Sequence, residues 1–201
     1  MAGTALKKVA DRTTVREMAV VLARSLFDDP SMIFLIPDDD ARAKQLPRLF
    51  DVILRKSLPF GVCSAVADGA EILGVAAWHP PGAMRSRTQE WATTAGYAWA
   101  LRGRTRRAET FGEALREAHP TQPHWYLSVL GTDPSAQGRG VGTKLLTDRL
   151  AECDRAGEPA YLETNKERNV RFYERFGFHV LQEIEIPEEG PRTWAMWRDP
   201  K

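Results

Sequence analysis

Cysteine is scarce in this chain of 201 residues. The two cysteines, Cys63 and Cys153, lie far apart in the sequence and form no Cys-x-x-Cys pair. Secreted disulfide scaffolds carry even sets of cysteines and structural zinc sites carry closely spaced ones, so the sequence favours neither class. We expect two small buried residues in a reducing compartment, and the sequence shows no metal-ligand spacing.

Long apolar runs and an excess of one charge are also missing. No stretch approaches the roughly 18 uncharged apolar residues of a membrane span, and residues 1–15 lack the apolar core of a signal peptide. Lysine and arginine total 28 against 27 aspartates and glutamates, so no overall field would hold the chain on nucleic acid or an anionic membrane. These absences predict a soluble, cytoplasmic protein without metal, nucleic-acid or membrane partners.

The length and the 43% hydrophobic content suit one core, so we expect a single domain over residues 1–201. Near the N-terminus, Thr14 and Glu17 have the spacing of a capping box, and the apolar residues that follow recur at helical spacing. They predict a helix over residues 14–27. A second amphipathic helix is indicated by the apolar residues between 46 and 56.

Strand signals begin in the middle of the chain. Residues 60–67 and 72–78 are apolar runs around an Asp-Gly turn, the pattern of a β-hairpin. Residues 88–119 then look helical, with a break at Gly103. The remainder alternates, with expected strands at 124–132, 160–164, 178–186 and 193–198 and expected helices at 140–155 and 167–176.

A glycine-rich segment stands between a predicted strand and a predicted helix, at residues 137–142. A helix N-terminus collects unpaired backbone N–H groups and the positive end of the helix dipole, and glycine lets a phosphate approach them. The dinucleotide fingerprint would need glycine at 143 or 145, and a P-loop would need Gly-Lys-Ser/Thr, so neither fits. We predict a diphosphate site here; the alternative is a flexible turn that merely starts a helix.

Two ordered motifs resemble those of the GNAT superfamily of N-acetyltransferases. Residues 126–134, followed by 137–142, look like motif A, in which a Q/R-x-x-G-x-G/A loop holds the pyrophosphate of CoA. Residues 162–165 and 169–178 are similar to the second signature, a strand followed by N-x-x-x-Y-E-x-x-G-F. The resemblance implies a GNAT fold of the α/β (α+β) class, a mixed twisted sheet splayed at its middle strands and flanked by helices.

The same resemblance implies acetyl-CoA as co-substrate in the split and a small-molecule primary amine entering from the opposite side. Residues 27–38 and 186–194 further resemble the branch that includes puromycin N-acetyltransferase, so an aminonucleoside or antibiotic-like acceptor is a hypothesis. The chain is expected to be a monomer or a homodimer. The implied cofactor-binding residues are Leu130, Gly131, Thr132, Gln137, Gly138, Arg139, Gly140, Val141, Gly142, Thr143, Asn165, Asn169 and Tyr173.

Acyl transfer needs a neutral amine, a polarised carbonyl and a proton for the leaving thiolate. The resemblance makes Tyr173 the acid, since a phenol of pKa about 10 keeps its proton at neutral pH; the alternative is a core aromatic. A backbone N–H near Thr132 would polarise the carbonyl. Glu163 is the candidate base because it ends a central strand facing the split, with an ion pair as the alternative. Asn165 and Asn169 either bind pantetheine or cap the next helix.

Several other patterns stay open. His79 and His124 could act as acid or base, although isolated histidines near strand ends are more often simply hydrogen-bonded. The basic run at residues 102–107 could attract the 3′-phosphate of CoA or form a solvated helix break. Gly131 and Thr132 replace the commoner Ala and Val of the family, and we expect backbone contacts to tolerate the change. A protein or peptide acetyltransferase and a non-catalytic acyl-CoA sensor remain alternative functions.

Overall fold

The computed structural model describes residues 5–9, 12–60, 62–82, 95–102 and 105–201. Within them, seven strands form one mixed sheet in the order β1-β2-β3-β4-β5-β7-β6. The strands are β1 (Ala5–Val9), β2 (Cys63–Asp68), β3 (Glu71–His79), β4 (Trp125–Thr132), β5 (Ala160–Thr164), β6 (His179–Ile184) and β7 (Thr193–Arg198). The helices are α1 (Arg12–Ser25), α2 (Pro30–Leu35), α3 (Asp39–Ser57), α5 (Thr105–Ala118), α6 (Val141–Ala156) and α7 (Glu167–Glu174), with residues 95–100 also helical.

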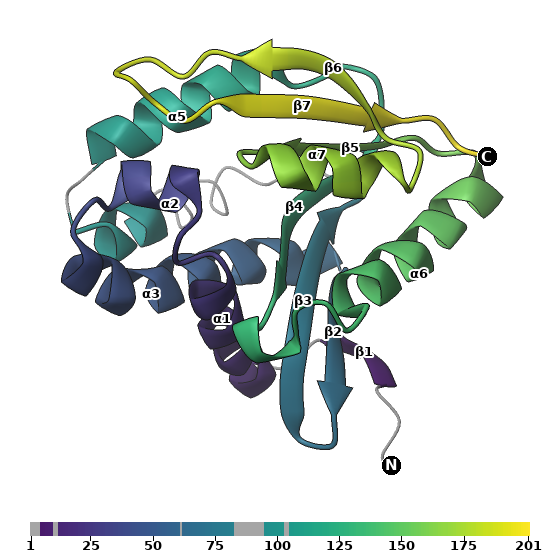
Figure 1. Cartoon of the computed structure of the whole chain (residues 1–201), viewed down its shortest axis with the longest axis horizontal. Coiled ribbons are helices and arrows are strands. Elements are labelled where there is room, and N and C mark those ends of the chain that lie inside the picture. Colours follow the sequence, from purple (N-terminus) through teal and green to yellow (C-terminus); the bar gives the residue numbers. More distant parts are fainter. Residues whose placement is uncertain (1–4, 10–11, 61, 83–94, 103–104) are drawn as a thin grey trace.

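Helices cover both faces of the sheet. Figure 1 shows α1, α2 and α3 on one side of the central strands and α6 on the other. One apolar cluster joins α1, α3 and α5 to the sheet, and a second joins α6 and α7 to the opposite face. Both cysteines are buried and free, as expected. None of the helices in the described part of the chain is long and apolar enough to cross a membrane.

The middle of the sheet opens between β4 and β5. These strands run parallel and pair only at residues 125–127 with 160–162. Beyond that point β4 stays paired with β3 as far as Thr132, and β5 stays paired with β7 as far as Thr164. The two central strands therefore part after Leu127 and Leu162, which produces the splay expected from the resemblance.

The C-terminal alternation of strands and helices and the hairpin are confirmed to within a few residues. The second amphipathic helix is also present, but it begins at Asp39, seven residues before the first apolar residue that indicated it. Three further N-terminal details differ. α1 begins at Arg12, so Thr14 lies inside the helix and the capping-box prediction is wrong. α2 was not expected: it follows closely after α1, with Asp29 as its N-cap and Pro30 in its first turn. β1 was not expected, since Ala-Leu-Lys-Lys-Val lacks an apolar run.

The helical region expected at 88–119 is described in part. α5 is present as expected, and residues 95–100 form a further helical segment. Residues 88–94 and the expected break at Gly103 lie outside the described residues.

Candidate functional site

The glycine-rich loop starts from a firmly held aspartate. Asp133 follows β4 and accepts hydrogen bonds from the backbone N–H and the hydroxyl of Ser135, at 3.0 and 2.7 Å. Arg24 of α1 donates to the same carboxylate at 2.8 Å. Burial opposes ionisation of Asp133, but the bonds from Ser135 and Arg24 outweigh it and hold the pKa of the carboxyl below its usual value. The loop therefore begins at an ionised, fixed side chain.

Two glycines give the loop a conformation that other residues adopt poorly. Gly138 and Gly140 have φ angles of 76° and 77°, in the left-handed region. A Cβ at either position would meet no atom within 4 Å, so the glycines serve the backbone path and leave open space beside it. Gly140 is the N-cap of α6 and offers no side-chain bond to the helix. The first N–H groups of α6 thus face an open surface, as an anion site requires.

The predicted contact strand lies directly beside this loop. Leu130, Gly131 and Thr132 follow the last β4–β5 pair, and the Gln137 amide donates to the Thr132 carbonyl at 3.4 Å. A Cβ on Gly142 would lie 3.6 Å from Thr132 Oγ1, which brings the helix start against the end of β4. The structure therefore gathers the strand end and the loop into one surface.

Gly131 has a packing role that the sequence interpretation missed. A Cβ at this position would lie 2.7 Å from Leu22 Cδ2 and 2.8 Å from Ser25 Oγ, both on α1. Contacts this short do not occur between real side chains and Cβ atoms. An alanine at position 131 would therefore require Leu22 and Ser25 to shift, because α1 packs directly on β4 there. The expectation that backbone contacts tolerate Gly131 and Thr132 stays a prediction.

Tyr173 lies on the α6–α7 side of the sheet. It is only 7% exposed, and its ring packs edge-on against Phe172 and Phe178 at centroid distances of 5.3 and 5.9 Å. Burial, and after it the charge of Asp29, raises the pKa of the phenol. The side chain is therefore a core aromatic that keeps its phenolic proton at physiological pH.

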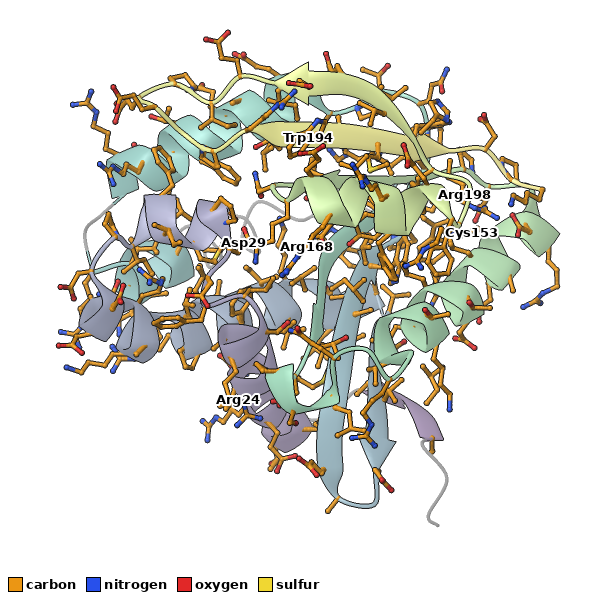
Figure 2. The ribbon with its side chains drawn as sticks, in the orientation of Figure 1. Arg24, Asp29, Cys153, Arg168, Trp194 and Arg198 are labelled. Atoms are coloured by element: carbon orange, nitrogen blue, oxygen red, sulfur yellow. The ribbon has the colours of Figure 1, made fainter. Side chains whose placement is uncertain are left out.

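The charge near Tyr173 comes from the N-cap of α2. Asp29 is buried, accepts from the Ser31 hydroxyl at 2.5 Å and lies 3.7 Å from Lys166 Nζ. Lys166 is the N-cap residue of α7, so this ion pair connects the start of α2 with the start of α7. In Figure 2 Asp29 lies between these two helices.

Glu163 lies at the opening of the sheet, on the opposite face from Tyr173. It is the first β5 residue beyond the last pair with β4, and its side chain is 8% exposed. Its Oε1 is buried and has no hydrogen-bond partner within the described parts of the chain. The nearest basic atom is His119 Nδ1, at 3.6 Å. The ion-pair alternative for Glu163 therefore involves His119, which was not among the sequence candidates.

Aromatic rings surround this carboxylate. His119 packs edge-on against Tyr126 and Tyr161, with ring centroids 5.0 and 4.9 Å apart. Burial raises the pKa of both phenols, and the charge of Glu163 raises it further. The tyrosines therefore stay neutral.

The two asparagines do not cap the helix that follows them. Lys166 is the N-cap of α7 and makes no side-chain capping bond. Asn165 donates to Thr193 Oγ1 at 2.5 Å, and Asn169 donates to Thr164 Oγ1 at 3.1 Å. The capping interpretation is therefore wrong: Asn165 connects the turn after β5 to β7, and Asn169 connects α7 to β5.

The remaining histidine candidates are hydrogen-bonded within the chain. His79 Nε2 lies 2.9 Å from Ser57 Oγ, and His124 Nδ1 lies 2.6 Å from the Gln122 carbonyl oxygen. In the basic run, Arg106 pairs with Glu188 at 2.8 Å and Arg107 donates to the Phe34 carbonyl at 2.9 Å. These contacts favour structural roles for the basic run.

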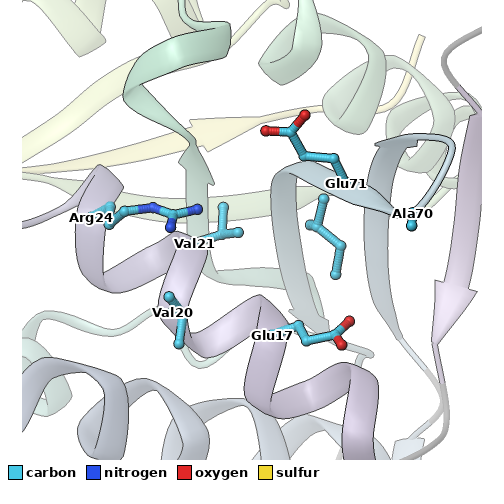
Figure 3. Close-up of a pocket in the computed structure, with 7 residues that line it drawn as sticks. Glu17, Val20, Val21, Arg24, Ala70 and Glu71 are labelled. Atoms are coloured by element: carbon cyan, nitrogen blue, oxygen red, sulfur yellow. The ribbon is translucent and has the colours of Figure 1, made fainter.

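A separate hollow of about 270 Å³ lies between α1 and the β2–β3 hairpin (Figure 3). Its lining mixes apolar and charged side chains: Glu17, Val20, Val21, Arg24, Ala70, Glu71 and Ile72. None of them is a predicted site residue, and the hollow touches the site described above only through Arg24, which binds Asp133.

Comparison with known proteins gives the family. Residues 23–178 match the acetyltransferase (GNAT) family. An uncharacterized N-acetyltransferase of Schizosaccharomyces pombe is 26% identical over 89% of this chain and 76% of its own length. A mycothiol acetyltransferase of Streptomyces scabiei is 30% identical over 83% of this chain, which spans only 55% of that relative.

A solved structure resembles the whole chain. It is described as histone acetyltransferase HPA2 and related acetyltransferase from Corynebacterium glutamicum, and it has 25% sequence identity and a TM-score of 0.70 over 98% of this chain and 97% of that one. Acetyltransferases of this family use acetyl-CoA as co-substrate. The family match covers both the glycine loop and the split between β4 and β5, and the chain belongs to the GNAT family of acyl-CoA-dependent acetyltransferases.

Proposed function

We propose that this chain, as one domain over residues 1–201, transfers the acetyl group of acetyl-CoA to a primary amine of a small molecule. The observation that supports this proposal most is the placement of a phenol, Tyr173, and a carboxylate, Glu163, on opposite faces of the opened sheet. Tyr173 belongs to the cluster under α6 and α7, whereas Glu163 contacts the side chains under α1 and α5. An acid on one face and a base on the other suit direct transfer between two substrates that enter from opposite sides.

The acetyl-CoA side is built mainly from backbone. The open left-handed glycines and the uncapped N-terminus of α6 support the pyrophosphate assignment. The β4 edge beyond Leu127 has no pairing with β5, so its N–H and C=O groups are candidates for pantetheine and the acetyl carbonyl. The proposed contacts are Leu130, Gly131, Thr132, Gln137, Gly138, Arg139, Gly140, Val141, Gly142, Thr143, Asn165, Asn169 and Tyr173.

The proposed reaction is a direct attack. Glu163 takes one proton from the ammonium form of the acceptor, and the neutral nitrogen then attacks the thioester carbon. A backbone N–H near Thr132 stabilises the charge that develops on the carbonyl oxygen. The carbon–sulfur bond breaks, sulfur takes the proton of Tyr173, and the phenolate recovers a proton from the nitrogen as the amide forms. The proton on Glu163 returns to solvent.

The burial of Glu163, the proposed base, favours a small acceptor molecule. Glu163 is nearly buried behind His119 and the tyrosine rings, and the pair of Asp29 with Lys166 narrows the access between α2 and α7. A peptide acceptor would be expected to need an open groove. An aminonucleoside or antibiotic-like acceptor stays a prediction, as do the monomeric or homodimeric state and the cytoplasmic location.

The test is thiol release from acetyl-CoA, followed with a chromogenic disulfide across aminonucleosides, aminoglycosides, polyamines, amino acids, amino sugars and short peptides. Saturable turnover with a small amine supports the proposal, whereas turnover confined to peptides overturns the acceptor class. Tight binding of acetyl-CoA without turnover on any amine favours the sensor alternative. The Tyr173→Phe variant serves as the control for enzyme-independent thiol release.

A further inference from the structure

His119 belongs to a row of polar contacts that runs inward to Glu163. At the end farthest from Glu163 along these contacts, His124 Nδ1 lies 2.6 Å from the Gln122 carbonyl oxygen. His124 Nε2 lies 3.1 Å from His119 Nε2, and His119 Nδ1 lies 3.6 Å from Glu163 Oε1. His119 follows directly after α5 and is 34% exposed, so it connects a nearly buried carboxylate with solvent.

The contacts determine where the protons lie. A carbonyl oxygen only accepts, so His124 Nδ1 carries a hydrogen. Burial lowers the pKa of His124, which keeps this ring neutral and leaves its Nε2 without a hydrogen. His124 Nε2 therefore accepts from His119 Nε2, which in turn carries the hydrogen of that ring. The neutral His119 consequently presents a bare Nδ1 to Glu163 Oε1.

Two acceptors facing each other leave one place for a proton. When both groups are unprotonated, the His119 lone pair and the Glu163 carboxylate repel. A single added proton on His119 Nδ1 converts this contact into an ion pair. The neighbouring rings do not compete for the proton, because Tyr126 and Tyr161 remain neutral and the Trp197 ring that contacts His124 is not an acceptor.

We propose that His119 and Glu163 accept the proton of the acceptor amine as one unit, with Glu163 touching the amine and His119 as the positioning residue that stores the proton. The proposal rests on the proposed acetyl transfer. The ammonium gives its proton to the Glu163 carboxylate, and the carboxylic acid so formed passes that same proton to His119 Nδ1, so the carboxylate is regenerated and an imidazolium is formed. After acetyl transfer, His119 releases the proton to solvent.

The tautomer can be measured without any substrate. The chain has four histidines, so long-range ¹H–¹⁵N correlation spectra of the full protein can be assigned with single His→Gln variants. In the neutral state we expect the Nε2–H tautomer for His119 and the Nδ1–H tautomer for His124. A hydrogen on His119 Nδ1 in the neutral ring would overturn the proposal, because the site facing Glu163 would then be filled.

The kinetic test compares His119→Gln with His179→Gln. The glutamine amide can still donate to His124, but it cannot accept a proton, and His179 is exposed on β6. We expect His119→Gln to lower kcat/KM about 10- to 100-fold at pH 7, and this loss to vanish near pH 10, where the acceptor amine loses its proton unaided. His179→Gln should match the wild type at every pH.

A double variant tests whether the two groups act as one. Combining His119→Gln with Glu163→Gln should cost no more than Glu163→Gln alone, because removing either member disables the pair. A loss from His119→Gln that is equal at all pH values, or multiplicative effects in the double variant, would overturn the proposal. Wild-type protein that acetylates no amine would instead count against the proposed function, whatever tautomer the spectra give.

Discussion

The two faces of the split sheet are built by different means. On the α6–α7 face, the proposed acetyl-CoA contacts come from consecutive residues of β4, the glycine loop and the start of α6. On the opposite face, Glu163 from β5 meets His119 from the end of α5 and Tyr126 from β4. One face therefore depends on a continuous backbone path, and the other depends on side chains that only the fold brings together.

This difference indicates which part of the site can change when the acceptor changes and which part stays the same. Backbone donors at a helix N-terminus serve any ligand with a diphosphate, so one loop can be kept while acceptors change. A pocket of side chains from several elements can be altered one residue at a time. The comparison predicts that variants of the α6–α7 face impair acetyl-CoA chemistry for every acceptor, whereas variants of the opposite face act on the acceptor.

The largest effect is expected at Tyr173. Tyr173→Phe removes the phenolic proton and keeps the ring that packs on Phe172 and Phe178. We expect kcat to fall about 10²- to 10⁴-fold with little change in acetyl-CoA affinity, because the leaving thiolate loses its acid. Stopped-flow turnover and calorimetry measure the two quantities. Unchanged kcat would remove the acid role and leave Tyr173 as a core aromatic only.

The next largest effect is expected for a variant that tests whether the glycine loop binds an anion. Gly140→Asp places a carboxylate beside the first N–H groups of α6, where the pyrophosphate is proposed to bind, and calorimetry should show at least a roughly 100-fold loss of acetyl-CoA affinity. Gly157→Asp is the matched control. Gly157 also has a left-handed φ, 67°, and open space, but it ends the same helix. Equal affinities in the two variants would contradict the assignment.

The contrast between the faces also explains what the sequence could predict. The glycine loop and the strand–helix alternation were predictable because each depends on neighbouring residues: two left-handed glycines, a helix start and regular apolar spacing. β1 escaped prediction because edge strands are specified by pairing, here with β2, more than by their own pattern. α2 escaped because Asp-Pro is typical both of a helix end and of a helix start.

His119 could not have been found from local sequence. It stands between α5 and a proline, where nothing nearby in the chain distinguishes it from a surface histidine. Its partners lie on β5 and at the start of β4, and only the packing of α5 against the sheet brings them within contact. The one sequence signal that pointed toward His119 is the position of Glu163 at a strand end. A carboxylate at such a position is expected to have a basic or hydrogen-bonding partner, but the sequence does not identify that partner.

A smaller effect, on the stability of the fold, is expected for a variant that tests the packing of α1 on β4. Gly131→Ala restores the residue commoner in the family, but its Cβ would meet Leu22 and Ser25 below 3 Å. We expect a destabilisation of about 1–3 kcal/mol in urea unfolding, because α1 must shift. Gly112→Ala is the control, since its Cβ would meet nothing within 4 Å on helix α5 and should stabilise slightly. Equal stability of the wild type and Gly131→Ala would show that α1 moves freely.

The smallest effect is expected for the ion pair of Arg24 with Asp133, which joins α1 to the start of the glycine loop. Asp133→Asn keeps an acceptor for Ser135 but loses the charge that Arg24 binds, and Arg24 is about half exposed. We expect a loss of about 0.5–1 kcal/mol at pH 7, by urea unfolding. Glu183→Gln, which breaks an exposed pair with Arg192, is the control for general charge effects.

The pH dependence of this loss has a definite sign. The folded pKa of Asp133 lies below its ordinary value, so the carboxylate's contribution is complete above about pH 4 and declines as the pH falls through the folded pKa. The wild type and Asp133→Asn should therefore converge in stability toward pH 2. Weaker acetyl-CoA binding by Asp133→Asn at pH 7 would mean that α1 helps to hold the glycine loop in place. Because α1 packs on the other face of the sheet, the two faces would then not be independent. Unchanged acetyl-CoA binding would mean that the glycines and the start of α6 determine the conformation of the loop without the ion pair to α1.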